Sequence, residues 1–247
     1  MKKLTLITAL FFVLSILGCE TQTEKQPHDQ GKADSTKQEA AGSNGHDHGH
    51  QHGEANAHMH KNDFEDLVKR FDDPARDDWQ KPDEVIAFLG DLVDKTVMDI
   101  GCGTGYFSFK LVEAGALVIA ADVDDRFLDL VNTKKQEGGV QNAQLSTRKL
   151  PYDSPELAAS EVDMVLIVDT YHHIEDRENY FKKVKAGLKE DGGLVVIDFK
   201  KEDSPMGPPK AMRMSASFVQ SELEGAGFSE FSTDSLLLPY QYILIAK

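Results

Sequence analysis

The stretch VMDIGCGTGYF, residues 97–107, joins a short apolar run to a helical pattern through a glycine-rich turn. Such a turn lets the backbone approach a ligand closely, and the start of the following helix favours negatively charged groups. Dinucleotide-binding turns have the pattern G-x-G-x-x-G, but Tyr106 stands here at the third glycine position of that pattern. Its ring would obstruct close packing of the helix on the strand, so the turn favours a nucleotide-type ligand other than NAD.

Strand-like and helical patterns alternate after this turn. We expect strands over residues 97–100, 117–121, 143–146, 162–168 and 194–199, and helices over residues 104–114, 125–137, 177–188 and 215–226. Two more strand-like stretches, residues 231–238 and 240–247, flank Pro239 as a terminal hairpin. Nearly continuous apolar strands are typical of a parallel sheet covered on both faces, so the pattern predicts a doubly wound α/β domain.

Helical patterns also precede the first strand. An apolar stripe with helical spacing covers residues 64–71, and Asp73 followed by Pro74 is typical of a helix start. A second helix start at Pro82 is followed by apolar residues on one face, namely Val85, Ile86, Leu89 and Val93. One ordered domain is therefore predicted from residue 62 to residue 247.

The first 20 residues, MKKLTLITALFFVLSILGCE, place two lysines before an apolar run that is too short for a comfortable membrane span. The run ends in ILGC, residues 16–19, which resembles the lipobox of bacterial lipoproteins. This resemblance implies that residues 1–18 are a signal peptide and that Cys19 is lipidated in the cell envelope. Because the next residue is Glu20, the expected address is the outer membrane facing the periplasm, or the cell surface of a single-membrane cell. An ordinary secretory signal with a chance cysteine is the alternative.

Residues 19–61 are predicted to be a disordered tether, because they hold almost no apolar side chains that could form a core. Six of them are clustered histidines, His46, His48, His50, His52, His58 and His60. Neutral imidazole is a common metal ligand, so the tether could capture a divalent metal ion, and a polar spacer is the alternative. Without cysteines or a rigid scaffold, a catalytic metal site is not expected there.

Composition argues against one class of partner. The 247-residue chain has a formal net charge of −15, and its Lys and Arg residues form no cluster that could follow a phosphate backbone. Nucleic acid is therefore not expected as a substrate. Cys19 and Cys102 are the two cysteines, so lipidation of the first would leave no pair for an internal disulfide.

The segment 99–105, DIGCGTG, closely resembles the first motif of the class I S-adenosylmethionine-dependent methyltransferases, and Asp122 ends the second strand as an acidic residue. The resemblance implies a Rossmann-like seven-stranded sheet, mostly parallel with a C-terminal antiparallel hairpin strand, helices on both faces, and S-adenosyl-L-methionine as cofactor. It also implies these cofactor contacts: Asp99 and Gly101, Cys102 and Gly103 at the methionine end, Asp122 on the ribose, Val123 beside the adenine, and Asp169. When the cofactor is absent, we expect the Asp122 carboxylate to be solvated in its cleft.

The fourth predicted strand ends in VDTYHHIED, residues 168–176. Residues at the carboxyl ends of parallel strands face the ligand crevice, so Tyr171, His172 and His173 are the candidate catalytic residues. A histidine could act there as a general base, which matters where the methyl acceptor arrives protonated, or as a donor that orients the acceptor. The alternatives are a helix cap, packing on the sheet, or a metal ligand.

These patterns together predict a membrane-anchored methyltransferase that acts on a small molecule or on an envelope component. Residues 62–95 resemble the N-terminal helical lid of exported members of that family, in which Arg76, Trp79 and Gln80 could close over the cofactor. In the alternative, Trp79 only plugs the surface of the domain. The rival function is a non-catalytic lipoprotein that binds a nucleoside or, through its histidines, a metal.

The lipid anchor gives the first testable prediction. Cys19→Ala should move the protein from the membrane fraction to the soluble fraction, because each buried methylene of an acyl chain contributes about 0.8 kcal/mol to membrane binding. Metabolic labelling with a fatty acid, followed by fractionation, measures both effects. A wild-type protein that carries no lipid and remains soluble would remove the lipoprotein interpretation.

Overall fold

The computed structural model describes Gly53, Asn56, Met59 and residues 61–247. The predicted signal peptide 1–18, the predicted lipidation site Cys19 and the six clustered histidines of the predicted tether lie outside these described residues. Within the part of the chain that is described, no helix combines the length and the apolar character needed to cross a bilayer.

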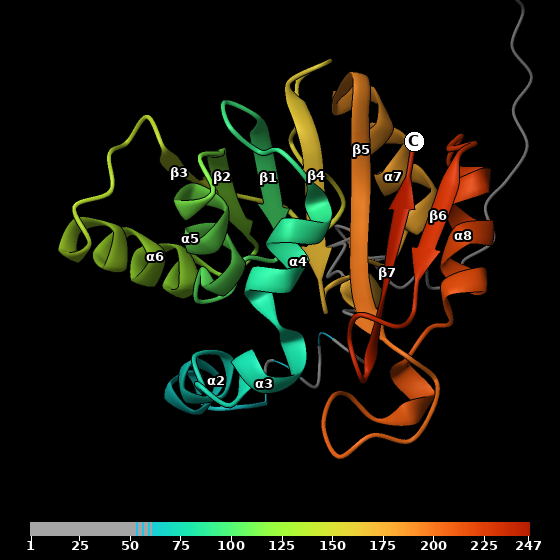
Figure 1. The fold of residues 1–247 in the computed structure, drawn as a ribbon, viewed down its shortest axis with the longest axis horizontal. Coiled ribbons are helices and arrows are strands. Elements are labelled where there is room, and N and C mark those ends of the chain that lie inside the picture. The colour runs from blue at the N-terminus through green and yellow to red at the C-terminus, as the bar shows by residue number, and fades with distance from the viewer. Residues whose placement is uncertain (1–52, 54–55, 57–58, 60) are drawn as a thin grey trace, which may run out of the picture. The chain divides into compact units, whose positions relative to one another are not determined.

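Seven strands form one sheet in the order β3-β2-β1-β4-β5-β7-β6 (Figure 1). They are β1 (Thr96–Ile100), β2 (Leu117–Asp122), β3 (Leu145–Lys149), β4 (Val162–Val168), β5 (Leu188–Phe199), β6 (Phe231–Asp234) and β7 (Gln241–Ala246). The first five pair in parallel, whereas β7 is antiparallel to both β5 and β6. The predicted fold class, a mostly parallel seven-stranded sheet with a C-terminal antiparallel hairpin, is confirmed.

The direction of winding reverses between β1 and β4. The chain moves outward from β1 through β2 to β3, and then crosses over to β4 and β5 on the other side. In open α/β sheets, ligands bind at such a switch point, outside the carboxyl ends of the strands. The topology therefore predicts that a ligand binds among the residues that follow β1, β2, β4 and β5.

Helices cover both faces of the sheet. They are α2 (Phe64–Phe71), α3 (Arg76–Gln80), α4 (Pro82–Leu89), α5 (Tyr106–Glu113), α6 (Asp125–Glu137), α7 (Arg177–Gly187) and α8 (Ala216–Gly225), with short 3₁₀ turns η1 (Tyr171–His173) and η2 (Lys210–Met212). One core cluster joins Met98 of β1 to Phe181 of α7, and the other joins Val97 to Phe107 of α5. Because successive side chains of a strand point to opposite faces, the neighbours Val97 and Met98 supply the two separate cores.

Several boundaries differ from the sequence expectation, and among them β6 ends at Asp234 instead of 238. Strand β3 occupies Leu145–Lys149 instead of 143–146, and β5 begins at Leu188 instead of 194. Both added segments are polar, and their strand conformation comes from pairing with β2 and β4. Helix α3 begins at Arg76, because the carboxylate of Asp73 accepts the N–H of Ala75 at 2.9 Å and forms a turn before the helix.

The predicted apolar face of α4 is also shorter than expected. The helix ends at Leu89, and Gly90 follows with a φ of 87°. Val93 therefore lies beyond the helix and is 59% exposed, whereas Val85 is fully buried. The periodic pattern continued past the glycine, but the helix did not.

Ring packing beneath η1 provides a test of the core. Phe181 is 1% exposed, and its ring stacks on that of Tyr171 with centroids 4.9 Å apart. Phe181→Ala should lower the free energy of unfolding by about 3–5 kcal/mol, because it removes the buried ring and leaves a cavity. Urea denaturation measures the change. The matched control Leu236→Ala, at a side chain that is 92% exposed, should change it by less than about 0.5 kcal/mol.

Candidate active site

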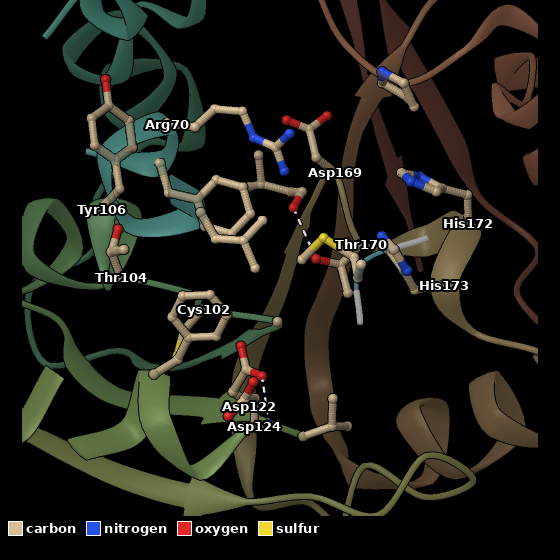
Figure 2. Close-up of a pocket in the computed structure, with 18 of the residues that line it drawn as sticks. Arg70, Cys102, Thr104, Tyr106, Asp122, Asp124, Asp169, Thr170, His172 and His173 are labelled. Carbon is tan, nitrogen blue, oxygen red and sulfur yellow. Dashed lines mark hydrogen bonds between the residues drawn. The ribbon is translucent and has the colours of Figure 1, made fainter. Parts of the chain in front are cut away.

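A cavity of about 750 Å³ lies at the carboxyl ends of β1, β2, β4 and β5. Helices α2 and α3 contribute to its wall, and so does the loop that connects β5 to η2. The predicted site residues that line it are Asp99, Gly101, Cys102, Asp122, Val123, Asp169, His172 and His173. Figure 2 shows that they come from separate strand ends, with Cys102 and Asp122 on one side and the histidines on the other.

The glycine turn after β1 needs its glycines for conformation and for space. Gly101 has a φ of 75°, and a Cβ atom there would lie 2.3 Å from Oγ1 of Thr170. Gly103 also has a positive φ, 52°, a region in which residues with a Cβ atom are uncommon. The turn therefore presents backbone to the cavity where any other residue would present a side chain.

Asp122 ties this turn to the end of β2. One of its carboxylate oxygens accepts the N–H of Gly103 at 2.9 Å, and the other accepts the N–H of Asp124 at 2.9 Å. The residue is 7% exposed, so the expectation of a solvated carboxylate was wrong. Burial raises the pKa of Asp122 to about 6, against the lowering effect of those two N–H groups. Because a carboxylate has about four acceptor positions, Asp122 can still accept hydroxyl groups from a ligand.

Asp99 lies nearby at the base of the cavity. Its carboxylate accepts the hydroxyl of Ser108 at 2.6 Å and is 3% exposed. Burial raises the pKa of Asp99 to about 6, and the nearby charge of Asp122 acts in the same direction. The hydroxyl of Thr104, which also lines the cavity, is buried without a hydrogen-bond partner among the described residues. Such an orphaned group fits a ligand that would supply the missing partner.

Cys102 and Val123 complete this side of the cavity. The thiol of Cys102 is buried, and burial raises its pKa well above the ordinary value, so it is not a thiolate nucleophile. Val123 packs against the core at the end of β2. Gly103 does not line the cavity, and its contribution is the N–H that it donates to Asp122.

A buried polar chain that the sequence did not reveal closes the opposite side. Arg76 donates to Oε1 of Gln80 at 2.8 and 2.6 Å, and Gln80 donates to Asp169 at 3.2 Å. Gln241 of β7 donates to the other oxygen of Asp169 at 2.7 Å. Both glutamines are fully buried. Burial and the charge of Asp198 raise the pKa of Asp169.

Arg76 itself has no carboxylate within ion-pair distance in the described part of the chain. Its guanidinium lies 4.0 Å from the ring centroid of Tyr106 and also donates to the carbonyl of Phe71. Burial lowers the pKa of Arg76, although it remains a cation. Three of its five N–H groups donate to Phe71 and Gln80. A ligand carboxylate could accept hydrogen bonds from the other two.

The three candidate catalytic residues of η1 lie in different surroundings. His172 pairs through Nδ1 with Asp198 at 3.2 Å, and His173 pairs through Nδ1 with the side-chain oxygen of Asn56 at 3.0 Å. The two imidazole centroids are 4.4 Å apart. Tyr171 points into the core, where its hydroxyl donates to Glu222 at 2.9 Å. The structure thus brings both histidines to the cavity and leaves Tyr171 out of it.

Apolar side chains form the wall beside the histidines. Trp79 packs on Phe199 with centroids 5.6 Å apart, and Met206, Pro208 and Met212 of the following loop line the same part of the cavity. Of the three lid residues suggested by the sequence, Arg76 and Trp79 line the cavity, and Gln80 holds Asp169. Whether the segment opens and closes stays a prediction.

The buried carboxylates give a pH-dependent prediction. An aspartate has a pKa of about 3.9 in the unfolded chain, whereas Asp99 has a pKa of about 6 in the fold. Between these values the folded state holds the extra proton, so the free energy of unfolding should fall as pH rises from about 4 to about 7. Asp99→Asn removes this titration and should reduce the fall by at most about 3 kcal/mol.

Urea denaturation across that pH range measures the effect. Asp78→Asn, which removes the same charge at an exposed position, is the matched control and should keep the slope of the wild type. Identical slopes for the wild type and Asp99→Asn would contradict the role assigned to burial.

Known proteins share this architecture. A family model described as "Methyltransferase domain" matches residues 98–196. The solved structure of a SAM-dependent methyltransferase from Aquifex aeolicus has a TM-score of 0.69 and 25% identity, over 75% of this chain and 98% of that one. An S-adenosylmethionine-dependent methyltransferase from Mesorhizobium loti has a TM-score of 0.56 and 16% identity, over 71% of this chain and 98% of that one.

A third structure is known with its cofactor. The magnesium protoporphyrin IX methyltransferase of Synechocystis PCC 6803, solved with bound SAM, has a TM-score of 0.52 and 24% identity, over 68% of this chain and 77% of that one. The two structures below 25% identity support the fold, and the family model supports the domain. Residues 98–196 therefore match a methyltransferase domain, and the chain has a Rossmann-like methyltransferase fold.

Proposed function

We propose that this protein transfers a methyl group from S-adenosyl-L-methionine, bound in the 750 Å³ cavity, to an acceptor on the histidine side of that cavity. The observation that carries the proposal is the position of Asp122. Its buried carboxylate lies at the end of β2, is fixed by two backbone N–H groups, and faces the cavity beside the glycine turn. A vicinal diol such as that of a ribose fits these acceptor oxygens.

The remaining groups fit the rest of the cofactor. Asp99 and the orphaned hydroxyl of Thr104 would hold its polar methionine end beside the backbone of residues 101–103. The unpaired guanidinium of Arg76 would neutralise its carboxylate. Val123 would lie beside the adenine, on the apolar floor next to Asp122.

The cofactor, when bound, supplies a methyl group on a positively charged sulfur. The chain then has to align an acceptor with that methyl group and to exclude water, and alignment alone can contribute several kcal/mol. The apolar wall of Trp79, Phe199 and Met206 suits the second task. The hydrogen bonds from Arg76 to Gln80 and from Gln80 to Asp169 keep α3 against the strand ends. They would help to align the acceptor with the methyl group.

The proposal also covers the location of the protein in the cell, its methyl acceptor and its metal partner. The lipobox-like sequence before Cys19 supports a lipid anchor in the cell envelope, and the acceptor is then a small molecule or an envelope component. The histidines between residues 46 and 60 would bind a divalent metal separately from catalysis. No group of metal ligands occurs among the residues that the structure describes.

The cofactor site is tested by Asp122→Ala. The change leaves ribose hydroxyls without their acceptor at a position where Asp122 is buried, so the affinity for S-adenosylmethionine should fall by about 2–4 kcal/mol. Thermal-shift curves with and without S-adenosylmethionine measure this, because a ligand that binds the folded state raises the melting temperature. Asp122→Asn keeps one acceptor oxygen and should lose less.

Asp129→Ala is the matched control, since this exposed carboxylate lies on α6 outside the cavity. It should keep the full shift of the wild type. If millimolar S-adenosylmethionine produces no shift in the wild type, the methyltransferase proposal gives way to a non-catalytic binding protein.

A further inference from the structure

We infer that His172 is the general base of the reaction, that Asp198 is its positioning residue, and that the acceptor is a hydroxyl group on an apolar body. This inference rests on the proposed methyl transfer and names the substrate class of that site. It is carried by the different partners of two adjacent histidines and by the composition of the cavity wall next to them.

Asp198 fixes the orientation of His172. It belongs to β5, is fully buried, and has one oxygen 3.2 Å from Nδ1 of His172. Its other oxygen accepts the backbone N–H of Phe199 at 2.7 Å. In the tautomer that carries its proton on Nδ1, His172 donates a hydrogen bond to this carboxylate. In neutral His172 the bare nitrogen is then Nε2, and Figure 2 shows the ring extending from η1 toward the part of the cavity where Asp169 lies.

The groups around His172 favour its protonated form. Burial lowers the pKa of His172, and Arg177 of α7 acts in the same direction. The hydrogen bond and charge of Asp198, together with the charge of Asp169 after β4, outweigh these effects and leave the pKa raised. A base in this position can accept a proton and hold it while the acceptor reacts.

His173 has a neutral amide, that of Asn56, among its partners. The amide oxygen of Asn56 accepts a hydrogen bond from Nδ1 of His173 at 3.0 Å, and the amide nitrogen donates to the backbone carbonyl of His173 at 3.0 Å. An amide does not stabilise an imidazolium as a carboxylate does. Since the two rings lie side by side at 4.4 Å, His173 provides a matched comparison for His172 within the same 3₁₀ turn.

The wall beyond His172 is shaped for an apolar body. Arg213, which is 6% exposed, holds the loop after β5 by donating to four backbone carbonyls. They belong to Lys200, Glu202, Met206 and Pro208, at 3.4, 2.7, 3.1 and 2.9 Å. The same loop presses Gly207 so closely to Phe199 that a Cβ atom would lie 2.6 Å from the ring. A fixed wall of rings, methionines and prolines has few polar partners to offer an acceptor beyond those beside it, which are Asn56, Asp169, Thr170, His172 and His173.

The step balances as follows. The acceptor O–H bond breaks and its proton moves to Nε2 of His172, while the oxygen forms a bond to the methyl carbon. The carbon–sulfur bond of the sulfonium donor breaks, and its electron pair remains on sulfur as a neutral thioether. The imidazolium of His172 is stabilised by Asp198 and Asp169, and it returns its proton to water once the methylated product leaves.

The test uses nitrogen NMR of the full chain, labelled with ¹⁵N-histidine and saturated with S-adenosylhomocysteine. His172→Gln assigns the resonances of His172, and His173→Gln is the matched control. We expect neutral His172 to carry its proton on Nδ1. Phenol should move the Nε2 resonance toward the value of a protonated nitrogen, whereas its methyl ether anisole, which has the same ring but no O–H group, should not. Asp198→Asn should lower the pH midpoint of His172.

A proton found on Nε2 of neutral His172, or equal responses to phenol and anisole, would overturn the inference. The comparison of the two probes needs only the wild-type chain, so it remains decisive if Asp198→Asn does not fold. A thermal shift with S-adenosylmethionine is recorded on the same sample. If that shift is present but the NMR result is negative, the inference fails and the methyltransferase proposal stands. If the shift is absent, the methyltransferase proposal fails instead.

Discussion

Two hydrogen bonds to one buried carboxylate hold the ligand-binding edge of this sheet together. Asp122 joins the glycine turn after β1 to the backbone after β2, because its two oxygens accept N–H groups from Gly103 and Asp124. An unpaired carboxylate at 7% exposure would be costly, so the turn and the strand end stabilise each other. The conformation of the turn then depends on glycine, since Gly101 leaves no space for a side chain beside Thr170.

The opposite edge of the cavity is organised by a second buried carboxylate, Asp169. It lies in a left-handed conformation with φ of 53° directly after β4, where Gln80 and Gln241 donate to its two oxygens. These donors come from an N-terminal helix and from the last strand. The shape of the cavity thus depends on contacts between the two ends of the domain, and Arg76 extends them from Gln80 to the ring of Tyr106.

Much of the fold was determined by the sequence alone. The alternation of apolar runs with helical patterns predicted the mostly parallel sheet, the helices on both faces and the terminal hairpin. This was possible because strands that are buried on both faces form nearly continuous apolar runs, which are visible in a short stretch of sequence. The glycine turn and the acids Asp99 and Asp122 were found in the same way, since a strand followed by a tight turn brings them to one edge. Polar strand segments were missed, because pairing rather than composition makes them strands.

What only the tertiary structure decided is which partner each polar side chain meets. Adjacent histidines that look equivalent in the sequence differ because His172 meets a carboxylate from β5, 26 positions away, and His173 meets an amide 117 positions away. Tyr171, one position earlier, turns into the core toward Glu222. Nothing in the sequence indicated that Gln241 is buried, and Gln80 was expected only as a lid residue. The spacing of apolar residues along the sequence indicates which residues are buried. Hydrogen bonds between distant segments depend instead on how the sheet brings the strand ends together.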